Sequence, residues 1–196
     1  MTLSSPDIEM HENGWNAVYT KHQHEKTVAE SLRHAFEVFL PTYISVRKWS
    51  DRRQRVSLPL FPCYVFLRAT FERRLQLLRT PGVHFLVMFA GEPATIPAVE
   101  INAIRKAVES GFRVKPHPFL RSGDWVRVKS GPLADVEGIF LRRKGSERLI
   151  LSCGLLGKSV SVELDAYNVT RISRPSAQFT SSIAHVPTQS LQHAAG

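Results

Sequence analysis

Ten residues in the first third of the chain, from Leu58 to Leu67, limit most strongly how this chain can fold. They read Leu-Pro-Leu-Phe-Pro-Cys-Tyr-Val-Phe-Leu, and every residue after the second proline is apolar or aromatic. A run without two-residue alternation predicts a central strand covered on both faces. Because Pro62 has no N–H for a ladder hydrogen bond, we expect the paired strand to begin at Cys63, with 58–61 as an extended, partly exposed lead-in.

The apolar lead-in has two interpretations that composition does not separate. Next to a strand that carries further aromatic residues, it suggests a surface that a partner covers. Ordinary core packing explains the same residues equally well one by one. The run is too short to cross a membrane, and its two prolines oppose a buried helix.

Charge narrows the class of partner. The 196 residues carry a formal net charge of +9, which favours nucleic acid, a ribonucleoprotein or an acidic protein surface. No stretch reaches about 18 uncharged apolar residues and residues 1–14 lack an apolar core, so we expect neither a membrane partner nor a signal peptide. Cys63 and Cys153 lie in separate apolar segments, which is typical of reduced thiols in a cytoplasmic protein.

The first part of the chain predicts an α+β domain over residues 15–110. Helical spacing of apolar residues and runs of strand formers predict an antiparallel sheet flanked by helices. The expected strands are 15–20, 42–46, 63–67 and 83–89, and the expected helices are 24–36, 70–79 and 98–110. Residues 1–14, polar and aperiodic, are expected to form a disordered arm.

The second part changes to short strands and glycine turns. Residues 111–120 contain two prolines and no apolar period, which predicts a linker. Five short strands are expected over 121–174, and in 159–164 valine and leucine alternate with serine and glutamate, so we predict a small all-β barrel. Residues 175–196 carry no Asp, Glu, Lys or Arg, and we expect a disordered tail.

One basic segment leaves its role open. Residues 47–55 hold five Lys and Arg residues around Trp49, and they predict either a solvated hairpin tip or a set of phosphate contacts. Trp49 could stack on a base or cap a sheet edge. By its residues alone, the turn 154–157 is a plain hairpin turn.

The search for catalytic chemistry finds no set of residues that supports it. Gly154 to Ser159 lacks the spacing of a phosphate-binding loop and lies between strands. His22 and His24 form a bare His-x-His pair, which is a weak metal signal, and no Ser–His–Asp or Cys–His set has a supporting spacing. We therefore expect a binding protein without catalytic residues, metal ligands or cofactor.

The order of motifs resembles the NusG-type transcription elongation and antitermination factors. The similar segments are Trp15 with Tyr19, the helix start His24-Glu25-Lys26, Pro59 to Phe66, Thr80 to Val83 and Gly91 to Ala94, followed by a KOW-like motif from Gly123 to Gly138. The resemblance implies an NGN-like domain followed by a small SH3-like barrel. Lys48 to Arg52 and the Pro-Leu-Phe-Pro lead-in look more like the specialised UpxY and RfaH-like paralogues than the housekeeping factor.

The resemblance implies a monomeric, non-enzymatic factor that binds RNA polymerase and suppresses pausing or termination. It assigns an apolar polymerase-binding patch to Tyr19, Leu60, Phe61, Tyr64, Phe66 and Phe85. It assigns contacts with the non-template DNA strand to Lys21, His22, His24, Arg73, Arg74 and Arg79. Leu155 and Leu156 would contact a partner, either the termination factor Rho or a ribosomal protein. The alternative is a structural RNA-binding KOW protein of the ribosomal type.

Overall fold

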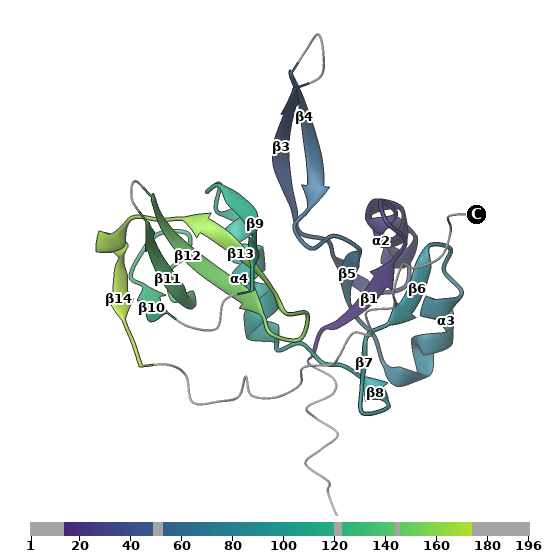
Figure 1. Cartoon of the computed structure of the whole chain (residues 1–196). Helices are drawn as coiled ribbons and strands as arrows, with labels where there is room; N and C mark the ends of the chain where they lie inside the picture. Colours follow the sequence, from purple (N-terminus) through teal and green to yellow (C-terminus); the bar gives the residue numbers. More distant parts are fainter. Residues whose placement is uncertain (1–13, 49–52, 120–122, 144–145, 174–196) are drawn as a thin grey trace, which may run out of the picture.

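The computed structural model describes residues 14–48, 53–119, 123–143 and 146–173 of the chain (Figure 1). The expected arm, apart from Gly14, and the expected tail lie outside the described residues. So does Trp49 in the expected charged hairpin tip. Within the described ranges, none of the helices combines the length and the apolar character needed to cross a bilayer.

A four-stranded antiparallel sheet forms the centre of the N-terminal part, with the strand order β2-β5-β1-β6. The strands are β1 (Asn16–Thr20), β2 (Glu37–Phe39), β5 (Tyr64–Arg68) and β6 (Val83–Leu86). One face packs against helices α2 (Glu25–Arg33) and α3 (Arg74–Leu78), the latter preceded by the 3-10 turn η1 (Phe71–Arg73). The predicted antiparallel sheet with flanking helices is confirmed.

Strand β5 is covered on both faces, as its continuous apolar run predicts. Val65 and Leu67 enter a cluster with the buried residues of α2 and α3, whereas Tyr64 and Phe66 enter a second cluster on the opposite face. Successive side chains of a strand point to opposite faces, so a strand with two buried faces has no polar positions to alternate.

The last two residues of the expected lead-in 58–61 are not exposed in the structure. Leu60 and Phe61 are fully buried, because the chain turns there and carries both side chains into the second cluster. The backbone N–H of Leu60 donates to the carbonyl of Pro41 at 2.9 Å, which fixes the turn. The strand also begins one residue later than expected, because Cys63 adopts a left-handed conformation with φ of 66°.

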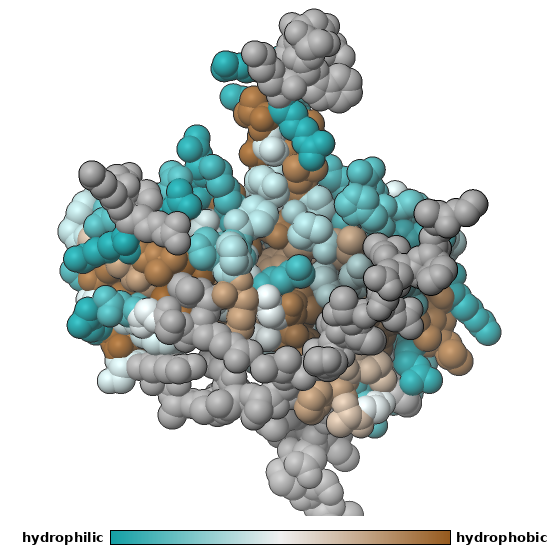
Figure 2. Space-filling model, in the orientation of Figure 1, coloured by the Kyte–Doolittle hydropathy of each residue, from teal (hydrophilic) through white to brown (hydrophobic). Residues whose placement is uncertain are grey.

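Strands β3 (Thr42–Lys48) and β4 (Arg53–Pro59) form a separate antiparallel hairpin. Figure 1 shows that this hairpin projects from the rest of the molecule. Two of its apolar side chains, Ile44 and Val46, are 63% and 60% exposed, and Figure 2 shows hydrophobic residues along the projecting arm. The hairpin therefore leaves apolar surface in solvent that the body of the protein does not cover.

The C-terminal part is a six-stranded antiparallel sheet with the order β14-β10-β11-β12-β13-β9. Its strands are β9 (Val114–Pro118), β10 (Asp124–Val128), β11 (Glu137–Arg143), β12 (Ser146–Cys153), β13 (Lys158–Glu163) and β14 (Val169–Arg171), with the 3-10 turn η2 (Ala166–Asn168) before the last. Gly138 in β11 permits a close approach, because a Cβ there would lie 2.5 Å from the carbonyl oxygen of Ile150. The predicted all-β class of this part is confirmed.

The expected linker 111–120 was wrong in its central residues. Strand β9 pairs with β13, with Pro116 opposite Val160 and Val114 opposite Val162. Proline has no backbone N–H to donate to a neighbouring strand, so it is rare in central strands. β9 is an edge strand that pairs on one side only, and there prolines are tolerated. The two prolines that suggested a linker therefore belong to the edge of the sheet.

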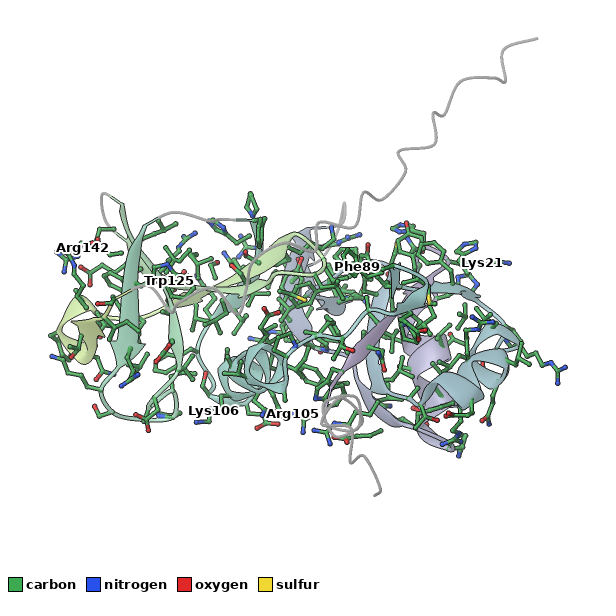
Figure 3. All side chains as sticks on the ribbon, turned by 90° about the horizontal axis from the view of Figure 1, so that it is seen from below. Lys21, Phe89, Arg105, Lys106, Trp125 and Arg142 are labelled. Atoms are coloured by element: carbon green, nitrogen blue, oxygen red, sulfur yellow. The ribbon has the colours of Figure 1, made fainter. Side chains whose placement is uncertain are left out.

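Helix α4 (Ala98–Glu109) lies between the two sheets (Figures 1 and 3). The short strands β7 (Met88–Phe89) and β8 (Glu92–Pro93) precede it in the chain. Ile101, Ile104 and Ala107 are fully buried in the second cluster, which also contains Phe66 of the N-terminal sheet and Val160 of the C-terminal sheet. The two parts of the chain therefore share one hydrophobic cluster.

Candidate interaction surface

Three aromatic side chains expected in the polymerase-binding patch meet at one end of the N-terminal sheet. Tyr19 stacks on Phe85 with a centroid separation of 4.9 Å and an interplanar angle of 12°. Tyr64 packs edge-on against Tyr19 at 5.2 Å. The strand register causes this grouping, because Tyr19 of β1 lies opposite Tyr64 of β5 on one side and Phe85 of β6 on the other.

Exposure divides the predicted patch into an outer and an inner group. The outer group is Phe85, which is 44% exposed, and Tyr19, which is half-buried. Tyr64 beside them is buried. The inner residues, Leu60, Phe61 and Phe66, are all buried, and Phe61 packs edge-on against Phe66 at 5.2 Å. The sequence placed all six side chains on one surface, but only the outer group is accessible in this conformation.

Both tyrosines of the patch remain protonated at physiological pH. The neighbouring Cys63 thiol, followed by burial, raises the pKa of Tyr19 above its usual value of 10.0. Burial, with a smaller contribution from Tyr19, raises the pKa of Tyr64. The outer group therefore offers uncharged aromatic surface and the phenolic hydroxyl of Tyr19, which is a composition typical of protein–protein contacts.

Side chains from the C-terminal half contact the inner part of the patch. The ammonium of Lys158 in β13 lies 5.9 Å from the ring centroid of Tyr64. Helix α4 is attached to the other end of the same sheet through Arg105, whose guanidinium lies 5.2 Å from the centroid of Trp15 and 3.6 Å from the carboxylate of Glu37. Leu60, Phe61 and Phe66 are buried because they share one hydrophobic cluster with side chains of α4 and of the C-terminal sheet.

Lys106, next to Arg105, extends from α4 to the turn between β10 and β11 of the C-terminal part. Its ammonium donates to the carbonyl of Ala134 at 3.3 Å. Figure 3 labels the side chains of Lys106 and Arg105. Sequence analysis missed the bridging role of this helix. Its amphipathic period could reveal a buried face but not which sheet that face contacts.

The basic residues expected to contact DNA fall into two groups. Lys21, His22 and His24 are exposed on the turn between β1 and α2, and the N–H of Lys21 donates to the carbonyl of Gly82, which places this turn beside the one that follows the exposed Arg79. The exposed Arg73 instead lies over Phe36, 4.2 Å from its ring centroid, and donates to Gln76.

Arg74 belongs with Arg73 on the short helical segment and is half-buried. The structure therefore groups three of the six basic candidates on one turn, adds Arg79 beside it, and holds Arg73 against Phe36. Figure 3 shows Lys21 at the end of the molecule opposite Arg142 of the C-terminal sheet.

The turn between β12 and β13 carries the expected partner contacts, Leu155 and Leu156. Both are half-buried and pack against the shared cluster. The adjacent N–H of Gly154 donates to the carboxylate of Glu100 in α4 at 3.1 Å. Burial raises the pKa of Glu100 from 4.5 to about 7. Part of the apolar surface of this turn therefore packs against the shared cluster and not against solvent.

A second feature missed by sequence analysis is a group of three possible metal ligands. His22, Glu25 and Cys63 bring their ligand atoms within 4.8 Å of one another. The weak His-x-His pair gave no indication of it, because Cys63 is 41 positions from His22 and His24 does not take part. Only the antiparallel pairing of β1 with β5 brings the two segments together.

Comparisons with known proteins agree with this architecture. The family model described as NusG, transcription termination factor, matches residues 13–105. A transcription termination/antitermination protein NusG from Pseudomonas aeruginosa is 28% identical over 173 residues, covering 81% of this chain and 98% of that protein. The NusG of Escherichia coli K12 is 28% identical over 172 residues, covering 80% of this chain and 95% of that protein.

A solved structure supports the fold. The structure described as the domain interaction in Thermotoga maritima NusG superimposes with a TM-score of 0.51 at 22% sequence identity. It covers 82% of this chain and 97% of that one. At this level of identity the likeness establishes the fold and does not extend to individual site residues.

Proposed function

We propose, from the premise that this chain is a NusG-type transcription factor, that its N-terminal domain (15–110) binds the clamp of RNA polymerase and suppresses pausing or termination. The stacked pair Tyr19–Phe85 carries the proposal, because it is the accessible part of the predicted patch. Aromatic residues that are rigidly held and partly exposed are typical anchors of a protein interface.

The inner residues have one of two roles, and the stability of a Phe61→Ala variant distinguishes between them. Leu60, Phe61 and Phe66 either support the outer aromatic residues from below or join the interface after α4 and the C-terminal sheet move away. In either case the factor works by binding the closed clamp better than the open one, which raises the population of the closed state. Binding by the outer group alone needs no rearrangement.

We propose further contacts for the two remaining surfaces. Lys21, His22, His24 and Arg79 meet the exposed non-template DNA strand, with Arg73 and Arg74 at the margin of the contact. Leu155 and Leu156 bind a second protein, either Rho or a ribosomal protein, through the KOW-like domain (121–174), whose sheet also includes β9. The protein acts as a cytoplasmic monomer without enzymatic activity.

The experiment compares two phenylalanines of similar exposure. Phe85 is 44% exposed in the patch, and Phe112, after α4, is 40% exposed outside it. We expect Phe85→Ala to weaken co-purification of full-length protein with RNA polymerase by at least about tenfold, as for an interface anchor, and Phe112→Ala to leave it unchanged. Equal retention by both variants, with folding verified by circular dichroism, contradicts the assignment.

A structural RNA-binding role for the C-terminal sheet makes the opposite prediction. In that case Phe85→Ala changes nothing, and affinity for folded RNA falls steeply with salt. Measuring RNA and polymerase binding on the same preparations distinguishes the two functions.

A further inference from the structure

His22, Glu25 and Cys63 meet where β1 ends and β5 begins. His22 lies on the turn after β1, Glu25 is the first residue of α2, and Cys63 immediately precedes β5. The ligand atoms of all three lie within 4.8 Å of one another, and the Sγ of Cys63 is 3.8 Å from the Nδ1 of His22. One thiol, one imidazole and one carboxylate therefore converge on a common point.

The separation of sulfur and nitrogen fits a shared tetrahedral ion. Zinc binds thiolate at about 2.3 Å and imidazole at about 2.0 Å, which at a tetrahedral angle separates the two ligand atoms by about 3.5 Å. The observed 3.8 Å needs only a small side-chain adjustment. A direct thiol–imidazole hydrogen bond could produce a similar distance, so the third group decides between the two.

Glu25 is the third group, and its charge lacks a basic partner. Its side chain is only 4% exposed, and Oε1 accepts a hydrogen bond at 2.7 Å from the backbone N–H of Cys63. Among the described residues, no Lys, Arg or His forms an ion pair with this carboxylate. A buried carboxylate without a cation is unfavourable, and a bound ion would supply the missing charge.

Two residues at the site, the ligand Cys63 and the neighbouring Gln23, have a backbone conformation that non-glycine residues rarely adopt. Cys63 and Gln23, which follows His22, have φ values of 66° and 63°. Left-handed backbone at such residues is unfavourable and concentrates at functional sites. The N–H of Thr20 donates to the carbonyl of Cys63 at 2.8 Å and so fixes the two segments together. The site is therefore formed before any ion arrives.

We propose that His22, Glu25 and Cys63 bind a divalent transition-metal ion of the zinc class. The thiolate and imidazole favour zinc over calcium or magnesium, which prefer oxygen ligands. Three protein ligands leave the fourth tetrahedral position to water or an incoming group. On binding, the Cys63 thiol releases its proton to solvent, and the thiolate and carboxylate charges balance the ion.

Ion binding has a mechanical consequence for the surrounding surface. It joins the turn 21–24 to the residue before Tyr64 and so fixes two segments that border the aromatic group of Tyr19 and Tyr64. The Nε2 of His22 lies 3.4 Å from the side-chain amide of Gln23, which can orient the ring for coordination through Nδ1. The inference concerns the isolated protein and does not depend on the proposed function.

The test titrates reduced full-length protein with Co²⁺, followed by displacement with Zn²⁺. We expect one equivalent of tetrahedral Co²⁺ with a thiolate-to-cobalt charge-transfer absorption. Cys63→Gly should abolish this absorption, and because glycine suits the left-handed backbone the variant should remain folded. His22→Ala should weaken binding by at least about tenfold.

Two substitutions serve as matched controls. His117→Ala, on the edge strand β9, should leave the affinity unchanged, and Cys153→Ala, which removes the other thiol, should leave the charge-transfer absorption in place. The proposal is overturned if the unmodified protein shows no such absorption, if Cys63→Gly retains it, or if His117→Ala weakens binding as much as His22→Ala. Circular dichroism of each variant confirms the fold.

Discussion

The carboxylate of Glu100 in α4 accepts a hydrogen bond from the backbone N–H of Gly154, so the helix is tied to the turn that precedes β13. Burial dominates the environment of this carboxylate and raises its pKa to about 7. A group with a raised folded-state pKa stabilises the fold below its unfolded value and loses that contribution as the pH rises through the folded value. The contribution of Glu100 to the free energy of unfolding therefore changes between pH 4.5 and about 7.

We expect the free energy of unfolding to fall across this window because Glu100 must ionise while buried. A rise of the pKa from 4.5 to about 7 corresponds to roughly 3 kcal/mol. Glu100→Gln should remove this dependence, since an amide oxygen can still accept from Gly154 and does not titrate. Urea unfolding between pH 4.5 and 8 measures the slope. Glu109→Gln, at an exposed residue of the same helix, is the control. If Glu109→Gln removes the pH dependence and Glu100→Gln does not, Glu100 is not its source.

Phe61→Ala should destabilise the fold by about 3–5 kcal/mol, because it creates a cavity at a side chain that is only 1% exposed. Phe85→Ala should cost about 1 kcal/mol, mainly the stacking on Tyr19. Guanidinium unfolding of both variants measures the difference. Equal and small losses would show that the inner group is not packed in solution, and would favour a conformation in which the C-terminal sheet leaves the patch.

Lys21→Ala should reduce the salt dependence of binding to single-stranded DNA. Each phosphate contact with a single strand contributes about 0.7 to the slope of log K against log salt, so the slope should fall by about that amount. Fluorescence anisotropy with a labelled oligonucleotide over a salt series measures it. Lys115→Ala, an exposed lysine of β9, is the control. An unchanged slope for Lys21→Ala argues against this turn as the DNA contact.

Leu156→Asp should weaken binding of the second partner by at least about tenfold, because it places a charge in a half-buried apolar contact. Pull-downs with purified Rho and with the small ribosomal subunit identify which partner is affected. Leu75→Asp, at a leucine of α3 that is 60% exposed, controls for an added charge elsewhere. Undiminished binding of both partners by Leu156→Asp excludes the turn 154–157 as their contact.

Patterns within one segment were the most reliable part of the sequence analysis. The continuous apolar run predicted a strand covered on both faces, and residues 64–67 are all buried. Helix 98–110 was correct to within one residue, because its apolar face and terminating glycine are local signals. The strand β2 was missed, because it is a three-residue edge strand that begins soon after α2 ends at Arg33.

Features that depend on long-range contacts could not be predicted. The prolines of β9 look like a linker until β13 pairs with it. In β13 the alternation was correct for Val160 and Val162, yet Ser161 is also buried, and its hydroxyl donates to the carbonyl of Lys115. The group of His22, Glu25 and Cys63 likewise depends on pairing between distant segments.

The position of α4 has a practical consequence for dividing this protein into halves. Cutting the chain after residue 110 would leave Ile101 and Ile104 on the N-terminal fragment without the strands of the C-terminal sheet that share their cluster. Such a fragment would expose the apolar face of α4 to water and would tend to self-associate. A loss of activity in the fragment could then come from self-association and not from the missing domain. Keeping both halves joined and introducing a protease cleavage site between β9 and β10 preserves the helix's neighbours until the chain is cut.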